Sequence, residues 1–121
     1  MALKIVKEEG VSLICIRVSD FQKILQKYWG YAAFRPLQLE IIESVAAGKD
    51  TLGLLPTGGG KSVTFQVYSL SVEGMCLVVT PLIALMKDQV ENLRKRGIRA
   101  LSLHSGMTAG EIKITYDNAV W

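Results

Sequence analysis

Apolar residues in the first half of the chain recur every three or four positions. This spacing predicts two amphipathic helices, at about 20–29 and 36–47. Gly30 and Gly48 follow these segments at the position where a glycine caps a helix C-terminus, and Pro36 suits a first helical position. The region before residue 50 is therefore expected to be helical.

From about residue 51, short apolar runs alternate with helical patterns. Strands are expected at 51–55, 75–80 and 99–103, and the run MCLVVT at 75–80 is apolar throughout, as in a strand buried on both faces. Helices are expected after each strand, at about 60–70, 82–96 and 108–120. This alternation predicts an α/β fold, a parallel sheet with helices on both faces.

Residues 1–18 do not continue either pattern. Leu3–Lys7 and Val11–Val18 are β-prone, and Glu9-Gly10 between them suits a hairpin turn; partial disorder or an appended segment is the alternative. We therefore divide the chain into an N-terminal extension of unknown role, 1–18, and the domain portion 19–121.

A glycine-rich loop joins the first expected strand to its helix, in the stretch LGLLPTGGGKS that ends at Ser62. Glycines let backbone N–H groups turn toward an anion, and the helix N-terminus adds partial positive charge. Lys61 is expected to reach the β/γ-phosphates of a nucleotide and Ser62 to ligate Mg²⁺. The motif G-x-x-x-x-G-K-[ST] departs only at Leu55, which replaces the first glycine. A plain flexible turn would not need the lysine and hydroxyl at these positions, so we expect a nucleotide site.

Aromatic and polar residues gather just upstream of this loop. Tyr31 could stack on an adenine ring, Gln38 could pair with its N6/N7 edge, and Arg35 could brace the loop or the base. On residue types alone, ordinary packing of Tyr31 and Phe34 with a solvated Gln38 is the favoured alternative.

A second candidate region follows the strand at 75–80. Thr80, Pro81 and Leu82 place a hydroxyl and a helix N-terminus at the carboxyl end of a strand, which suits a nucleic-acid phosphate. A simple strand–helix corner is equally compatible. The basic run Arg94–Arg96 is expected to be solvated, and His104 is expected to be a loop residue.

The composition limits the number of domains, the kinds of partner and the location of the protein. The 121 residues amount to one domain at most, and the formal charge of +3 with a pI near 9.0 favours polyanion partners. Cys15 and Cys76 lie far apart in apolar runs, so we expect buried thiols in a reducing compartment and no disulfide between them. No apolar run is long enough to span a membrane and the first residues do not form a secretory signal, so we expect a cytoplasmic location without membrane contact.

Taken together, three stretches resemble the RecQ family of DNA helicases. They are GYAAFRPLQLEII (30–42), LLPTGGGKS (54–62) and VVTPLIALMKDQV (78–90), in the order and spacing of that family's adenine-binding element, phosphate loop and first DNA-contacting element. Leu55 fits, because the family carries a large apolar residue there. Tyr68-Ser69 departs from the usual Pro-Ala, and residues 1–18 have no recognised counterpart.

The resemblance implies a fold and a set of site residues. The fold is that of a P-loop NTPase, with a RecA-like parallel sheet, here truncated. Tyr31, Arg35 and Gln38 would hold adenine, and Thr80, Pro81 and Leu82 would contact single-stranded or partly duplex DNA. The phosphates of ATP and its Mg²⁺ would be held by Thr57, Gly58, Gly59, Gly60, Lys61 and Ser62, with Ser62 on the metal and Lys61 also acting in catalysis.

The implied activity is ATP-dependent 3′–5′ DNA unwinding in repair and recombination by the full-length protein. The family's acidic D-E-x-H motif does not occur in this sequence, nor does a second RecA-like domain follow. The chain alone is therefore expected to be catalytically incomplete, and its unpaired strands are expected to favour self-association.

Two other functions remain open. A small P-loop kinase would need a catalytic acid and an arginine-rich lid after the third strand, which the sequence lacks. A nucleic-acid-binding module without ATPase activity would use only the basic surface. Nucleotide titration of the chain and of its Lys61→Ala variant separates the module from the helicase hypothesis.

Overall fold

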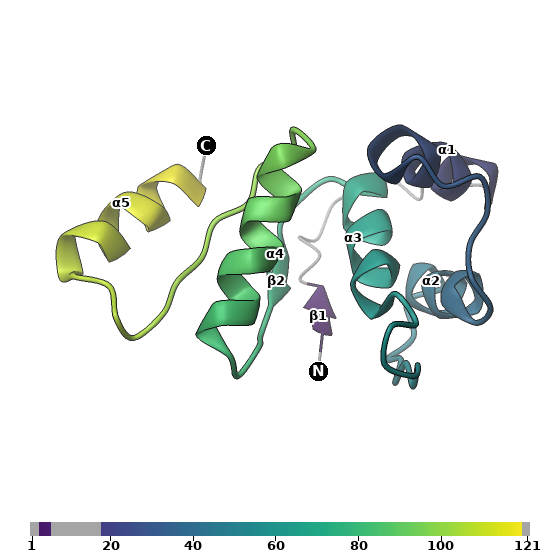
Figure 1. The fold of residues 1–121 in the computed structure, drawn as a ribbon, viewed down its shortest axis with the longest axis horizontal. Helices are drawn as coiled ribbons and strands as arrows, with labels where there is room; N and C mark the ends of the chain where they lie inside the picture. The colour runs from purple at the N-terminus through teal and green to yellow at the C-terminus, as the bar shows by residue number, and fades with distance from the viewer. Residues whose placement is uncertain (1–2, 6–17, 120–121) are drawn as a thin grey trace. The chain divides into compact units, whose positions relative to one another are not determined.

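The computed structural model describes residues 3–5 and 18–119 (Figure 1). The hairpin expected within residues 1–18 lies largely outside this part. The elements, in chain order, are β1 (Leu3–Ile5), α1 (Val18–Trp29), α2 (Gln38–Ala46), α3 (Lys61–Ser71), β2 (Cys76–Val78), α4 (Ile83–Lys95) and α5 (Ala109–Ala119). The five helices agree with those expected from periodicity. They fall into two compact units, residues 1–79 and residues 80–121.

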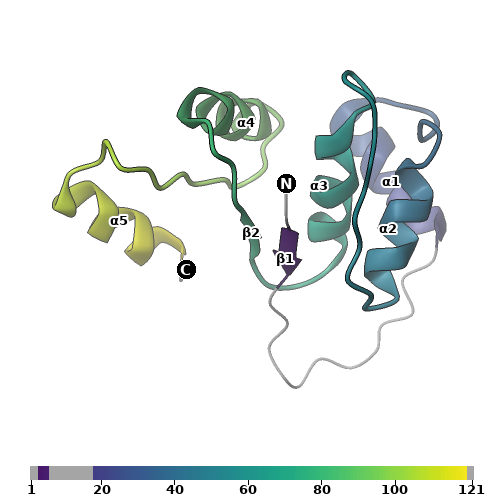
Figure 2. The ribbon, with the colours of Figure 1, turned by 90° about the horizontal axis from the view of Figure 1, so that it is seen from below.

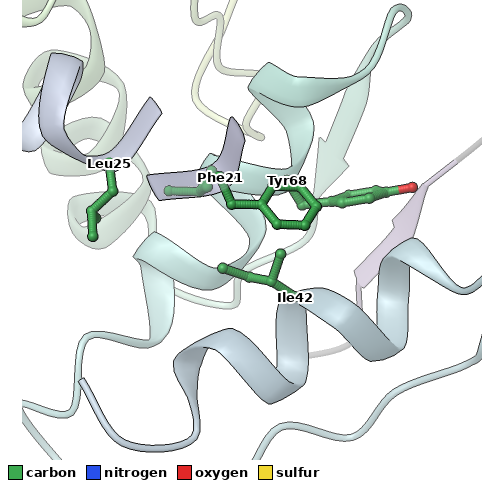
Figure 3. Packing of buried hydrophobic residues seen from close by; sticks show 5 residues of the cluster. Phe21, Leu25, Ile42 and Tyr68 are labelled. Atoms are coloured by element: carbon green, nitrogen blue, oxygen red, sulfur yellow. The ribbon is translucent and has the colours of Figure 1, made fainter. Parts of the chain in front are cut away.

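The core of the first unit is formed by three helices. Phe21 and Leu25 lie one turn apart on α1, so both point to the same side, where they belong to one buried cluster with Ile42 of α2. Val67 and Tyr68 of α3 complete the cluster. α1 and α2 both lie beside α3 (Figure 2). The rings of Phe21 and Tyr68 lie near each other (Figure 3), with centroids 6.5 Å apart. Each fully buried large side chain contributes about 1.5–3 kcal/mol. This cluster fixes α2 and α3 beside each other, and both carry residues of the candidate site.

α2 begins two residues later than expected. Pro36 is not its first residue, because Pro36 and Leu37 form a turn closed by a hydrogen bond from Gln38 N–H to the Arg35 carbonyl, 3.1 Å. Leu37 has φ 68° and ψ −12°, a left-handed conformation that a helix cannot include. At the other end, Gly48 follows with φ 76° and its N–H bonds to Val45 O, so the predicted glycine cap is confirmed.

The expected parallel sheet is not confirmed. Of the strands expected at 51–55, 75–80 and 99–103, only the second forms within the described residues, as β2, and it pairs antiparallel with β1, with Leu3 opposite Val78 and Ile5 opposite Cys76. The strands expected at 51–55 and 99–103 are wrong, since both segments are irregular. A strand exists only through hydrogen bonds to a neighbour. The apolar runs at 51–55 and 99–103 lack that neighbour among the described residues.

The second unit holds α4 and α5. α4 ends in a Schellman motif, in which Ile98 N–H bonds to Leu93 O and the predicted cap Gly97, at φ 76°, bonds to Arg94 O. α5 begins with a capping box in which Thr108 and Glu111 bond reciprocally. Neither helix buries a residue fully. No helix of residues 3–5 and 18–119 is long and apolar enough to cross a membrane.

Candidate nucleotide site

The glycine-rich loop adopts a conformation that requires glycine at two positions. Gly58 and Gly60 have φ of 78° and 74°, in the left-handed region. Between them, Gly59 N–H bonds to Pro56 O at 2.9 Å, which closes a tight turn. α3 begins immediately afterwards at Lys61, so the loop delivers the chain to a helix N-terminus. The N–H groups of a helix's first turn have no acceptor within the helix and are suited to bind an anion.

Lys61 lies across this loop. Its ammonium group donates to the carbonyl oxygen of Pro56 at 3.3 Å, five residues upstream. The side chain is exposed, so a phosphate entering the loop can accept a hydrogen bond from the same ammonium. Ser62 follows as the second residue of α3 and is half-buried.

Arg35 connects the turn before α2 to the glycine-rich loop. Its guanidinium nitrogen Nη1 donates to the carbonyl oxygen of Gly58 at 2.5 Å, across 23 residues of sequence. Arginine has five donors and uses one here, so the guanidinium retains capacity for a further acceptor. The structure thus places the Arg35 side chain at the glycine-rich loop.

Gln38 makes the second connection, and it is buried. Its side chain is 3% exposed. The amide oxygen Oε1 accepts from the Arg35 backbone N–H at 2.8 Å, and the amide nitrogen Nε2 donates to Gly60 O at 3.0 Å and to Gly59 O at 3.3 Å. One amide therefore joins the turn before α2 to the loop before α3. A glutamine was expected at a base edge, and here its polar groups are bonded within the chain.

A side chain at residue 60 would also require the Gln38 amide to move. A Cβ built on Gly60 would collide with Nε2 of Gln38, whereas a Cβ on Gly58 would meet nothing within 4 Å. Gly60 is required for its backbone conformation and for this close approach, and Gly58 only for its backbone conformation.

The residues present fit a nucleotide with Mg²⁺. Lys61 and the helix N-terminus supply positive charge for phosphates, and Ser62 supplies a hydroxyl for the metal. Tyr31 is 50% exposed, so its side chain is accessible to a ligand. Within the described part of the chain, no group of three His, Cys, Asp or Glu side chains could hold a metal ion. A magnesium ion here would depend on the phosphates, as Mg²⁺ sites usually do.

The structure brings together Arg35, Gln38, Gly58–Gly60 and Lys61, and places Thr57 in the same loop. Thr80–Leu82 belong to the second unit, where Leu82 is 61% exposed and precedes α4 with an extended backbone. Two contributors were missed from the sequence. Pro56 supplies a carbonyl acceptor, and Leu37 supplies the left-handed turn. Carbonyl contacts leave no sequence signal, while Pro36 in a turn position was the available signal for Leu37.

Comparison with known proteins places the chain among helicases. Residues 35–118 match the family described as DEAD/DEAH box helicase. The chain is 48% identical over 94 residues to "ATP-dependent DNA helicase RecQ" of Synechocystis sp., covering 78% of this chain and 20% of that protein. It is 43% identical over 95 residues to "Probable ATP-dependent DNA helicase RecS" of Bacillus subtilis, covering 78% and 19%. A plant relative, "ATP-dependent DNA helicase Q-like 4B" of Arabidopsis thaliana, is 46% identical over 99 residues, with 77% and 9% covered.

The chain belongs to the DEAD/DEAH box helicase family. The relatives found are RecQ-type helicases of bacteria and eukaryotes, so the resemblance to the RecQ family is confirmed. Membership implies the RecA-like P-loop fold at the level of the family. The chain spans about a fifth of the length of the two bacterial relatives, at 20% and 19%.

Proposed function

We propose that this chain is the ATP-binding portion of an ATP-dependent DNA helicase of RecQ type. The observation that carries the proposal is the joined loop and turn, in which Arg35 and Gln38 bind the carbonyls of Gly58–Gly60 directly before Lys61. In this proposal residues 19–121 are the start of the helicase ATP-binding domain and residues 1–18 are an extension. A cytoplasmic location and roles in DNA repair and recombination are part of the same proposal.

Each residue of the site has a chemical role in this proposal. ATP supplies a phosphoanhydride bond for hydrolysis, and Mg²⁺ shields its phosphate charge. Lys61 binds the β/γ-phosphates, the glycines and Thr57 line them with backbone N–H groups, and Ser62 orients the metal. Tyr31 stacks on the adenine, and Arg35 and Gln38 hold the base next to the loop. Lys61 and Ser62 provide the binding half of the reaction. The acidic D-E-x-H motif that would orient water is absent from this sequence, so the 121-residue chain alone should not turn over ATP.

Nucleotide titration tests the proposal. Lys61→Ala removes a charged donor to phosphate, and a hydrogen bond to a charged group is worth about 1.5–3 kcal/mol, so ATP affinity should fall at least about tenfold. Lys49→Ala is the matched control, because Lys49 is exposed and lies outside the loop. The measurement is titration calorimetry with Mg²⁺ and ATP. Equal ATP affinity of the wild type and Lys61→Ala would instead favour a nucleic-acid-binding module without a nucleotide site.

We also propose that Thr80–Leu82 contact single-stranded DNA. The exposed Leu82, the N-terminus of α4 and the net charge of +3 support it. Each neutralised phosphate releases counterions, so the logarithm of affinity should fall with the logarithm of salt concentration by about 0.7 per phosphate. Fluorescence anisotropy with labelled oligonucleotides at several salt concentrations measures this slope. A salt-independent affinity, or strong preference for one sequence, would contradict it.

A further inference from the structure

Leu37 occupies a backbone conformation that its residue type disfavours. In the described part of the chain it is the one residue other than glycine with positive φ. Its φ of 68° and ψ of −12° match the third position of a type II turn, and the bond from Gln38 N–H to Arg35 O at 3.1 Å closes that turn. Pro36 at the second position suits such a turn, but the third position favours glycine or asparagine, because a Cβ there crowds the neighbouring carbonyl.

Packing of the Leu37 side chain does not compensate for this strain, because the side chain is 51% exposed. The first and last residues of the turn, Arg35 and Gln38, are the ones bound to the glycine-rich loop. Arg35 donates to Gly58 O, and Gln38 accepts from Arg35 N–H while donating to Gly59 O and Gly60 O. Those hydrogen bonds form only when Arg35 and Gln38 are placed as they are in this turn, so they favour the left-handed form of Leu37. The left-handed turn, in return, is what brings both side chains to the loop.

An ordinary residue at the third position favours a type I turn, in which φ is negative and the peptide group before it is rotated. That rotation changes the direction in which α2 leaves the turn, and so the position of the Gln38 side chain relative to Arg35. The structure has the type II form, and in that form α2 is joined to the loop by Arg35 and Gln38.

We propose that Leu37 is a positioning residue of the nucleotide site: its left-handed turn sets Arg35 and Gln38 on the phosphate loop, and the residue at this position controls how often they are in place. The part of this proposal that concerns nucleotide binding rests on the proposed function. Apparent affinity falls in proportion to the fraction of molecules in the binding-competent form.

A series of substitutions at residue 37 tests the proposal in the 121-residue chain. Leu37→Gly accepts positive φ without strain, Leu37→Ala removes the side chain but keeps the strain, and Leu37→Val is the least suited to positive φ. We expect hydrogen exchange at the Gln38 side-chain amide and the Arg35 backbone amide to be about fivefold slower in Leu37→Gly, unchanged in Leu37→Ala and about fivefold faster in Leu37→Val. ATP affinity should follow the same order. Leu101→Gly is the control, because Leu101 is exposed and has no positive φ.

The outcomes separate this proposal from the proposed function. Equal exchange at Gln38 and Arg35 in Leu37→Gly and Leu37→Val would overturn the positioning role, even if every variant binds ATP. Exchange in the expected order, with no ATP binding by wild type or variants, would uphold the turn and overturn the nucleotide site. A melting temperature that follows the series without any change in amide exchange would show a purely structural effect and also overturn the positioning role.

Discussion

The surroundings of Gln38 in the structure differ from those predicted from the sequence. A glutamine at this position suggested a solvated side chain or a partner for a base, and the structure shows an amide that is 3% exposed and bonded at both ends. Its oxygen has a second lone pair, but both N–H groups of Nε2 face carbonyls. Pairing with adenine therefore requires at least one of the loop contacts to be exchanged for the base. Binding of a base by Gln38 would thus change the hydrogen bonds that Gln38 makes to Gly59 and Gly60.

Gln38→Glu tests this arrangement. A carboxylate replaces the Nε2 donor by an acceptor that faces the carbonyls of Gly59 and Gly60, and leaving such buried groups unpaired costs about 1–3 kcal/mol. We expect a lower free energy of unfolding, measured by urea denaturation. The wild type should also prefer ATP over GTP in competition, and this preference should shrink in the variant. Gln26→Glu is the control, because it makes the same chemical change at an exposed position of α1. Equal wild-type affinities for ATP and GTP would exclude an adenine role for Gln38.

At the scale of elements, the loop before α3 can be probed with two glycines of almost equal conformation. Gly60 and Gly48 have φ of 74° and 76°, but an added Cβ would meet a neighbour within 4 Å only at Gly60, where it would strike the Gln38 amide. Alanine at either position should cost about 1–2 kcal/mol for left-handed backbone. Gly60→Ala should cost more than Gly48→Ala, and it alone should weaken ATP binding. Thermal unfolding and ATP titration of both variants measure the difference. Equal losses in stability would mean that the Gln38 contact contributes nothing.

The capping box of α5 predicts a dependence on pH. Hydrogen bonds from the Thr108 backbone N–H and hydroxyl lower the pKa of Glu111 below its ordinary value of 4.5. Since the folded-state pKa lies below the unfolded value, ionised Glu111 stabilises the helix above about pH 4.5, and this contribution is lost as the pH falls through the folded-state pKa. Glu111→Gln should reduce that loss, measured as the helical circular dichroism signal between pH 6 and pH 2. A variant with the same pH profile as the wild type would contradict the capping role.

The helices could be predicted from sequence and most of the strands could not, for a physical reason. Phe21 and Leu25 recur at helical spacing, and Gly48 and Gly97 stop helices by local backbone geometry, so the signal lies within a few residues. Strand formation at 51–55 depends on partners elsewhere, which a local apolar run does not specify. For the candidate site, the sequence proposes residues but does not indicate the hydrogen bonds between them. The type II turn at Leu37 contradicts local residue preference, and it is held by contacts more than twenty residues away.

At the scale of the whole molecule, β2 presents apolar side chains on a face that the described residues leave open. Leu77 of β2 and the flanking Met75 and Val79 are 56%, 63% and 65% exposed, while Cys76 and Val78 between them are half-buried. The two-stranded sheet also leaves one edge of β2 without a strand neighbour among the described residues. Exposed apolar strands with open edges promote pairing with another chain.

We therefore expect the 121-residue chain to associate with itself. Sedimentation velocity at increasing concentration should show a shift from monomer to dimer or larger species. Leu77→Lys places a charge on the open face of β2 and should weaken association, whereas Ile114→Lys, at a similarly exposed position of α5, should not. A chain that stays monomeric at all concentrations, or equal effects of the two substitutions, would contradict an interface at β2.

The contact between Cys76 of β2 and Ser69 of α3 also supplies a chemical reporter. Burial raises the pKa of the Cys76 thiol, and the hydrogen bond with the Ser69 side chain of α3 lowers it by less. Alkylating reagents attack the thiolate, so Cys76 should react slowly while the strand is docked and quickly whenever it detaches. With Cys15 replaced by serine, the rate of alkylation reports how often β2 detaches. This rate can be measured with and without nucleotide or DNA, and the protein needs no label.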